Sequence, residues 1–168
     1  DEPLAPSALM RIGGIHAQQG NLAQARNAYM RLVSDYPESS QRPEAELEML
    51  GLLAREGKYP GVVSESAEVL KGGRAPSQQA RALALVGDAH AALGAHLKAI
   101  EAYTRALRLA APNEQELIVP KLRAAILRLK VADASALAER PEDDIPMDYL
   151  LFQSGMVMAR EGRAAEAL

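Results

Sequence analysis

The chain has 168 residues, of which 48% are hydrophobic and 24% charged, and its formal net charge is −3. This balance is typical of one folded domain, and the acidic sign argues against a nucleic-acid-binding surface. The sequence contains no cysteine, which excludes disulfide scaffolds, thiolate zinc sites and cysteine nucleophiles. Alanine, the best helix former, contributes 32 residues, against one phenylalanine and no tryptophan. The composition therefore predicts an all-α protein.

Apolar residues recur at helical spacing between glycine and proline breaks. We expect Pro43 at the start of a helix, Ser77 and Asn113 as helix caps, and a kink or a fresh start at Pro120. The glycine pair at 72–73 should end a helix. The predicted helices cover residues 6–19, 22–35, 43–56, 59–71, 77–92, 96–110, 113–130, 133–139 and 146–160.

No apolar run approaches the ~18 residues that a bilayer-spanning helix needs, so no direct membrane span is predicted. The chain opens with Asp1 and Glu2 and lacks the basic and apolar segments of a signal peptide. It begins without methionine and stops at Leu168 inside an expected helix. We therefore expect a fragment of a longer chain.

Four glycines divide the predicted helices into pairs. Gly20, Gly57, Gly94 and Gly162 each follow the first helix of a pair, at separations of 37, 37 and 68 residues. Directly after a helix, a positive φ is easiest for glycine. We expect one domain of repeated helix pairs over about residues 6–37, 43–74, 80–112, 113–140 and 146–168.

The first and third units share residues at identical spacing. The matched positions are Leu9, Ile12, Gly13, His16, Gly20, Ala25 and Tyr29, and then Leu83, Val86, Gly87, His90, Gly94, Ala99 and Tyr103. This pattern resembles the tetratricopeptide repeat, a helix–turn–helix unit of about 34 residues. The resemblance implies an all-α superhelical solenoid of about four and a half units. The second and fourth units depart from the pattern.

Small residues are predicted where the two helices of a unit cross, because a side chain there would push the helix axes apart. In the second unit Leu50 replaces the packing glycine, and Gly51 is expected to take over the close contact. His16 and His90 share one repeat position and are interpreted as packing residues. The residues assigned to repeat packing are Gly13, Gly20, Ala25, Tyr29, Gly87, Gly94, Ala99, Tyr103, Gly155 and Gly162.

No sequence pattern points to catalysis, a metal or a cofactor. His96 has no Asp or Glu three or four residues later, and no H-E-x-x-H motif is present. The carboxylates at 142–148 are interpreted as a solvated loop, since nothing indicates the burial that a general acid needs. The glycines at 72–73 lack the G-K-[ST] ending of a phosphate-binding loop. The sequence therefore predicts a protein that is not an enzyme.

The family resemblance implies a concave groove, lined by the first helix of each unit, that binds a peptide or partner protein. One subgroup binds a C-terminal carboxylate with Lys and Asn at fixed positions, which here hold other residues, such as Met10 and Gly14. We expect a small apolar floor with polar residues near its rim; alternatively, the small residues only let neighbouring helices pack. The residues assigned to partner binding are Met10, Arg11, Gly14, Gln18, Leu47, Gly51, Arg55, Ala84, Asp88 and Ala91.

The predicted helix over 146–160 is apolar around most of its circumference, which is typical of a buried helix. Its next neighbour along the chain is missing. Either a second copy of the chain covers it, which would mean self-association, or the exposed face is a result of truncation.

Two segments are similar to bacterial envelope proteins. Tyr29, Leu32, Tyr36, Pro37 and Ser39 resemble the end of a repeat in outer-membrane assembly lipoproteins and the Tol–Pal coordinator. The run from the fourth unit (about residues 113–140) through Ile145, Pro146 and Tyr149 to Gly162 is similar to the N-terminal helical half of penicillin-binding-protein activator lipoproteins. This resemblance implies a periplasmic or envelope location and a regulatory module that activates a peptidoglycan synthase. It is the alternative to a general interaction scaffold, for which a cytoplasmic location stays open.

Overall fold

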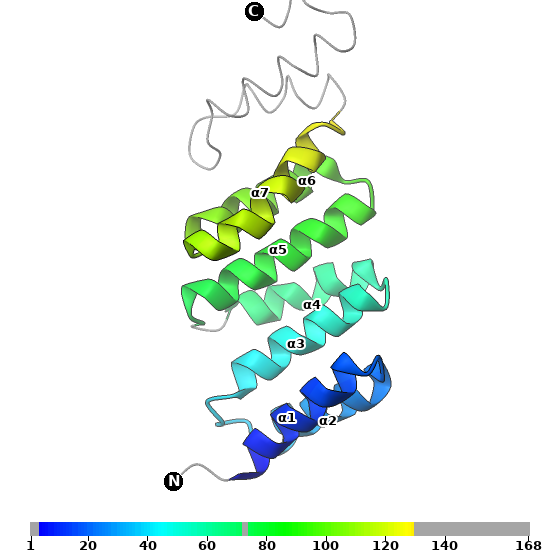
Figure 1. The fold of residues 1–168 in the computed structure, drawn as a ribbon, viewed down its shortest axis with the longest axis vertical. Coiled ribbons are helices and arrows are strands. Elements are labelled where there is room, and N and C mark those ends of the chain that lie inside the picture. The colour runs from blue at the N-terminus through cyan, green and yellow to red at the C-terminus, as the bar shows by residue number, and fades with distance from the viewer. Residues whose placement is uncertain (1–3, 72–73, 130–168) are drawn as a thin grey trace, which may run out of the picture.

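The computed structural model describes residues 4–71 and 74–129, and all regular structure in these ranges is α-helical (Figure 1). The helix bounds lie within two residues of those predicted, except that the last helix ends at Ile126 and not near residue 130. The helices are α1 (Leu4–Gln18), α2 (Leu22–Asp35), α3 (Arg42–Arg55), α4 (Tyr59–Lys71), α5 (Pro76–Ala92), α6 (His96–Leu109) and α7 (Pro112–Ile126).

The helices form two layers, which confirms the predicted solenoid. Helices α1, α3, α5 and α7 lie side by side in one layer, and α2, α4 and α6 lie behind them (Figure 1). Each helix packs against the next along the chain, and α5 also contacts α3 and α7. Helix α1 is held against α3 mainly through α2. The first layer is therefore more open between α1 and α3 than between α3 and α5.

Two glycines allow the layers to approach closely. A Cβ atom on Gly13 would lie 2.4 Å from the ring of Tyr29, and a Cβ atom on Gly87 would lie 2.4 Å from the ring of Tyr103. Both rings are almost completely buried. Each tyrosine thus occupies the space that a side chain on the facing helix would need.

In the second unit the large and the small residue at the helix crossing are exchanged between the two helices. At the positions of the glycine and the tyrosine it has Leu50 and Ser66, and both are buried. The large residue is therefore on the first helix and the small one on the second. The hydroxyl of Ser66 donates to the carbonyl of Val63 at 2.9 Å, which satisfies its buried oxygen. The expectation that Gly51 takes over the contact is wrong, because a Cβ atom there would meet nothing within 4 Å.

The turns inside the first three units share one geometry. Gly20, Gly57 and Gly94 have φ values of +79°, +71° and +74°. In each turn the residue after the glycine donates its N–H to a carbonyl in the last turn of the preceding helix, as Ala95 does to His90 at 2.8 Å. This is the pattern of a glycine-terminated helix, in which the left-handed residue closes the carbonyl end. The glycine spacing therefore marks real repeat boundaries.

Prolines, and not the predicted polar caps, start two helices. Helix α5 begins at Pro76, so Ser77 lies inside its first turn. Helix α7 begins at Pro112, and its first turn is closed by the Glu114 carboxylate, which accepts the Ala111 N–H at 2.9 Å. A proline at the first helical position has the right φ and no N–H to satisfy. That preference outweighs the capping tendency of Ser77 and Asn113.

Helix α7 runs through Pro120 without a fresh start. A proline inside a helix leaves the carbonyl four residues earlier without its usual donor. Here that residue, Glu116, and Pro120 itself are both exposed, so water can reach the carbonyl. The predicted acidic loop, the helix over 146–160, Gly155 and Gly162 lie outside the described residues.

Candidate functional site

Two adjoining cavities form a groove along the layer that contains α3, α5 and α7. One, of about 360 Å³, is lined by all three helices, and the other, of about 430 Å³, is lined by residues of α3, α5 and the start of α4. The two cavities share four lining residues, so we call them together the A groove. The shared residues are Glu48, Gly51, Leu85 and Asp88.

The floor of the A groove is apolar and includes an exposed leucine. Gly51 faces open space, and Ala84 and Leu85 from α5 are only partly buried. Leu117 of α7 lines the same cavity with 71% of its surface exposed. An exposed large apolar side chain inside a concave surface is a feature of sites that take up a partner.

Charged side chains cross the groove from α5 to α3. The Arg81 guanidinium lies 2.6 Å from Glu44 Oε1 and 2.9 Å from Glu48 Oε1. Gln78 also donates to Glu44, at 2.9 Å. Burial by itself would raise the pKa of Glu44, but the hydrogen bonds from Arg81 and Gln78 and the charges of Arg81 and Arg74 hold it below the usual value. These contacts fix α5 against α3.

A second polar cluster joins α5, α6 and α7. The Tyr103 hydroxyl donates to Asp88 Oδ1 at 2.7 Å, and Lys121 Nζ lies 2.7 Å from Asp88 Oδ2. Burial, then the hydrogen bond to Asp88 and the negative charge of Asp88, raise the pKa of the Tyr103 hydroxyl well above its usual range. Tyr103 therefore stays protonated and acts as a donor.

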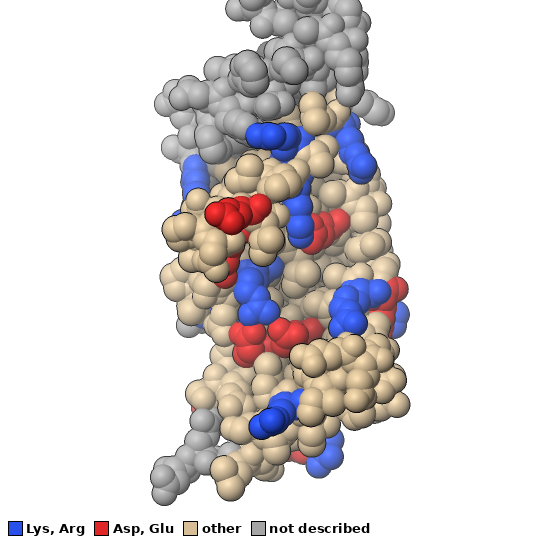
Figure 2. All heavy atoms as spheres, viewed as in Figure 1, with Lys and Arg blue, Asp and Glu red and all other residues tan. Residues whose placement is uncertain are grey.

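The carboxylates of the groove are all bound within the chain. Glu48, Asp88 and Glu114 each accept from a donor, and Arg81 and Lys121 are engaged with them. Arg55 is the lining cation with no ion pair or hydrogen bond among the described residues. Figure 2 shows acidic and basic side chains interleaved on this face, without a large area of one sign. The free charge in the groove is positive.

The structure brings together only part of the predicted partner-binding set. Gly51, Arg55, Ala84 and Asp88 line the A groove. Leu47 borders it too, but this residue is 1% exposed and belongs to the core. Ala91 packs against the core cluster of the third unit. Met10, Arg11, Gly14 and Gln18 lie on α1 and line neither cavity.

The partner-binding set predicted from the sequence lacks the residues that form ion pairs between neighbouring helices. Glu44, Arg81 and Lys121 were not assigned to the site, although all three make ion pairs there. A usable signal was present, because opposite charges recur at about one repeat length: Glu44 and Arg81 are 37 residues apart, and Asp88 and Lys121 are 33 apart. In a solenoid, residues one repeat apart face each other on neighbouring first helices.

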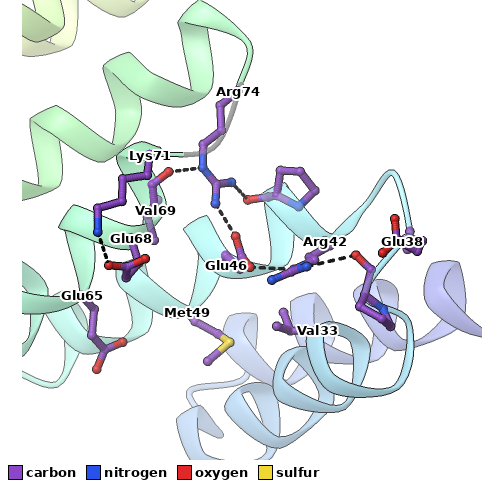
Figure 3. A pocket seen from close by; sticks show the side chains of 13 residues that line it. Val33, Glu38, Arg42, Glu46, Met49, Glu65, Glu68, Val69, Lys71 and Arg74 are labelled. Atoms are coloured by element: carbon purple, nitrogen blue, oxygen red, sulfur yellow. Dashed lines mark hydrogen bonds and ion pairs between the residues drawn. The ribbon is translucent and has the colours of Figure 1, made fainter.

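A separate cavity of about 730 Å³ is lined by the α2–α3 connection, α3 and α4. Arg74 lies at the edge of this cavity and is buried. Its guanidinium donates to the carbonyls of Val69 and Pro43 and pairs with Glu46 (Figure 3). Glu46 also pairs with Arg42 at 2.9 Å. This cluster ties the segment before α5 to α3, so we assign it a structural role.

The histidines have surroundings that fit packing. Burial, assisted by the charge of Lys98 and opposed by that of Glu101, lowers the pKa of His90. The Nδ1 atoms of His16 and His96 are buried without a hydrogen-bond partner. Among the residues that the structure describes, no three His, Asp or Glu side chains gather as metal ligands. In the same ranges, no helix combines the length and the apolar character that crossing a membrane requires.

The fold and the repeat geometry agree with the family comparison. A family model described as a tetratricopeptide repeat-like domain matches residues 2–126. The chain belongs to the tetratricopeptide repeat-like family. The match covers all seven helices described above. No match was found among proteins with curated descriptions.

Two solved structures share the fold. The crystal structure of MamA protein aligns with 98% of this chain and 86% of its own, with a TM-score of 0.62 and 16% identity. A tetratricopeptide repeat protein from Parabacteroides merdae ATCC 43184 aligns with 98% of this chain at a TM-score of 0.65 and 13% identity. The present chain spans 64% of the length of that second protein. At these identities the likeness is one of fold.

Proposed function

We propose that this protein is a non-catalytic interaction module that binds a peptide segment of a partner protein in the A groove. The observation that carries the proposal is the continuous concave surface formed by the two cavities, with an exposed Leu117 and an open floor at Gly51. Tetratricopeptide repeat folds are commonly used as extended concave binding surfaces.

The state of the polar groups supports binding over catalysis. Glu48 and Asp88, the carboxylates that could take part in acid–base chemistry, are engaged in ion pairs that hold helices together. A general acid or base needs a free position beside a reacting atom and a pKa near the working pH. The apolar floor of the A groove and its hydrogen-bonded polar side chains instead resemble the apolar centre and polar rim of a protein–protein interface.

A binding selection with paired variants tests the proposal. Random peptides displayed on phage are selected against the protein and then measured against Gly51→Leu, which fills the floor shared by both cavities. Gly51→Ala is the matched control, because its single methyl group has room. We expect Gly51→Leu to weaken binding by at least about tenfold, while Gly51→Ala stays within about twofold of the wild type.

The outer layer supplies the second control. Ser64 is exposed on α4, so Ser64→Arg should leave binding unchanged. Equal binding by Gly51→Leu and wild type, or loss of binding in Ser64→Arg, would move the interface away from the A groove and contradict the proposal. The activator-lipoprotein alternative depends on the run from the fourth unit to Gly162, most of which lies outside the described residues, and it stays a prediction.

A further inference from the structure

The first and third units have a tyrosine at the same repeat position, but the residues around its hydroxyl differ. Tyr29 and Tyr103 are at equivalent repeat positions, and so are Gly14 and Asp88. In the third unit the carboxylate of Asp88 accepts from the Tyr103 hydroxyl and pairs with Lys121, both at 2.7 Å. The fold itself therefore displays a carboxylate bound between a tyrosine hydroxyl and a cation on the groove side of this repeat position.

In the first unit a glycine replaces that carboxylate. A Cβ atom on Gly14 would have the Tyr29 hydroxyl 3.8 Å away as its nearest neighbour, and a Cβ atom on Gly51 would meet nothing within 4 Å. The Tyr29 hydroxyl has no hydrogen-bond partner among the described residues. Tyr29 is only 1% exposed, but a Cβ atom has room beside its hydroxyl at Gly14, and we call this space the Gly14 notch.

A cation without an ion pair in the described part of the chain lies on the neighbouring first helix, α3. Arg55 is one helical turn after Gly51 on α3, so both residues face the same side. Leu52 is buried in the same apolar cluster as Tyr29, and Arg55 follows Leu52 by three residues, so Arg55 starts from the face of α3 that is turned toward this phenol. In agreement, burial and the charges of Glu48 and Glu44 raise the pKa of Tyr29, whereas the charge of Arg55 lowers it. Glu44 and Glu48 are both bound to Arg81. Arg55 is left with no partner.

We propose that the bound peptide inserts an Asp or Glu side chain into the Gly14 notch, where its carboxylate accepts from the Tyr29 hydroxyl and pairs with Arg55. This inference rests on the proposed peptide-binding function and specifies the class of peptide. The carboxylate repeats what Asp88 does two units later. A carboxylate held by a hydroxyl donor and a guanidinium is among the stronger polar contacts in proteins.

A side chain, and not the peptide's C-terminal carboxylate, fits the surface better. The two cavities of the A groove meet at Gly51 and continue along α5 to α7. Gly14 and Gly51 present no side chain that would stop a backbone. A peptide that reaches Arg55 can therefore continue past Gly51 toward α7.

The test uses the peptides selected on the wild-type protein and reads their sequences and affinities. We expect Asp or Glu to be enriched at one internal position. Arg55→Gln should weaken these peptides by about tenfold, and Tyr29→Phe, which keeps the buried ring, by several-fold. Arg31→Gln, which removes an exposed cation from α2, is the matched control and should change nothing.

The decisive variant supplies the carboxylate from the protein itself. Gly14→Asp should place its carboxylate on the Tyr29 hydroxyl, keep the thermal midpoint of unfolding, and abolish the preference for acidic peptides, whereas Gly14→Ala retains it. Selected peptides that depend on Gly51 but show no acidic residue, and bind Arg55→Gln normally, would overturn this inference and leave the groove function standing. If enrichment occurs only at the peptide C-terminus, the side-chain assignment is wrong. A protein that selects no peptide dependent on Gly51 would overturn both proposals.

Discussion

Gly13 and Gly87 set the distance between the two helix layers, because each lies directly under a buried tyrosine ring. The second unit reaches the same result with Leu50 and Ser66 in reversed order. Glycine normally weakens a helix interior by up to about 1 kcal/mol relative to alanine. At these two positions the packing of the ring outweighs that intrinsic cost.

Two glycine substitutions of the same chemistry should have opposite effects. Gly87→Ala places a methyl group 2.4 Å from the Tyr103 ring and should lower the free energy of unfolding by about 1–3 kcal/mol. Gly51→Ala has room and should raise it by a few tenths to about 1 kcal/mol. Urea unfolding followed by circular dichroism measures both. A neutral Gly87→Ala would contradict the packing role of this residue.

Helix α5 is the element that joins the layer, since it holds α3 through Arg81 and α7 through Asp88. Neither contact was predicted, and the reason lies in geometry. Successive residues are rotated by about 100° around a helix axis, so the apolar period identifies which face of a helix is buried. It does not identify which residue of another helix lies opposite across a groove. The contacts become predictable only when the repeat length is used to align successive first helices.

Removal of the Asp88 carboxylate should loosen α5 from α7. Asp88→Ala leaves the Tyr103 hydroxyl and Lys121 without their acceptor and should lower the free energy of unfolding by about 1–2 kcal/mol. Asp88→Asn retains an acceptor oxygen for Tyr103 and should cost less. Denaturant unfolding of the three proteins gives the comparison. Identical midpoints would mean that the cluster contributes nothing to the packing of α7.

Acid should weaken the contact between α3 and α5. The pKa of Glu44 in the folded protein is below its usual 4.5, so its ionised form stabilises the fold above pH 4.5, and this contribution is lost as the pH falls through the lower folded value. Glu44→Gln should therefore reduce stability at neutral pH and reduce it less in acid. Unfolding measured at both pH values, with exposed Glu65→Gln as the control, tests this. An equal loss at the two pH values would contradict the linkage.

At the scale of the whole molecule, the solenoid fold could be predicted from the sequence, whereas most residues that line the A groove could not. Helix order and turns follow from apolar periodicity and from Gly20, Gly57 and Gly94, which are local signals. The helix starts at Pro76 and Pro112 were displaced from the predicted polar caps by a competing local preference. The groove depends on how three separate helices register, so only some of its residues, such as Gly51, could be named in advance.

Amide NMR mapping of the isotopically labelled protein with a selected peptide tests whether the A groove is the binding surface. The largest chemical-shift changes should fall on the A groove, at Gly51, Leu85, Asp88 and Leu117, and also on Gly14 and Arg55 when the peptide is acidic. Changes concentrated on the outer layer of α2, α4 and α6, with the A groove unaffected, would contradict this expectation.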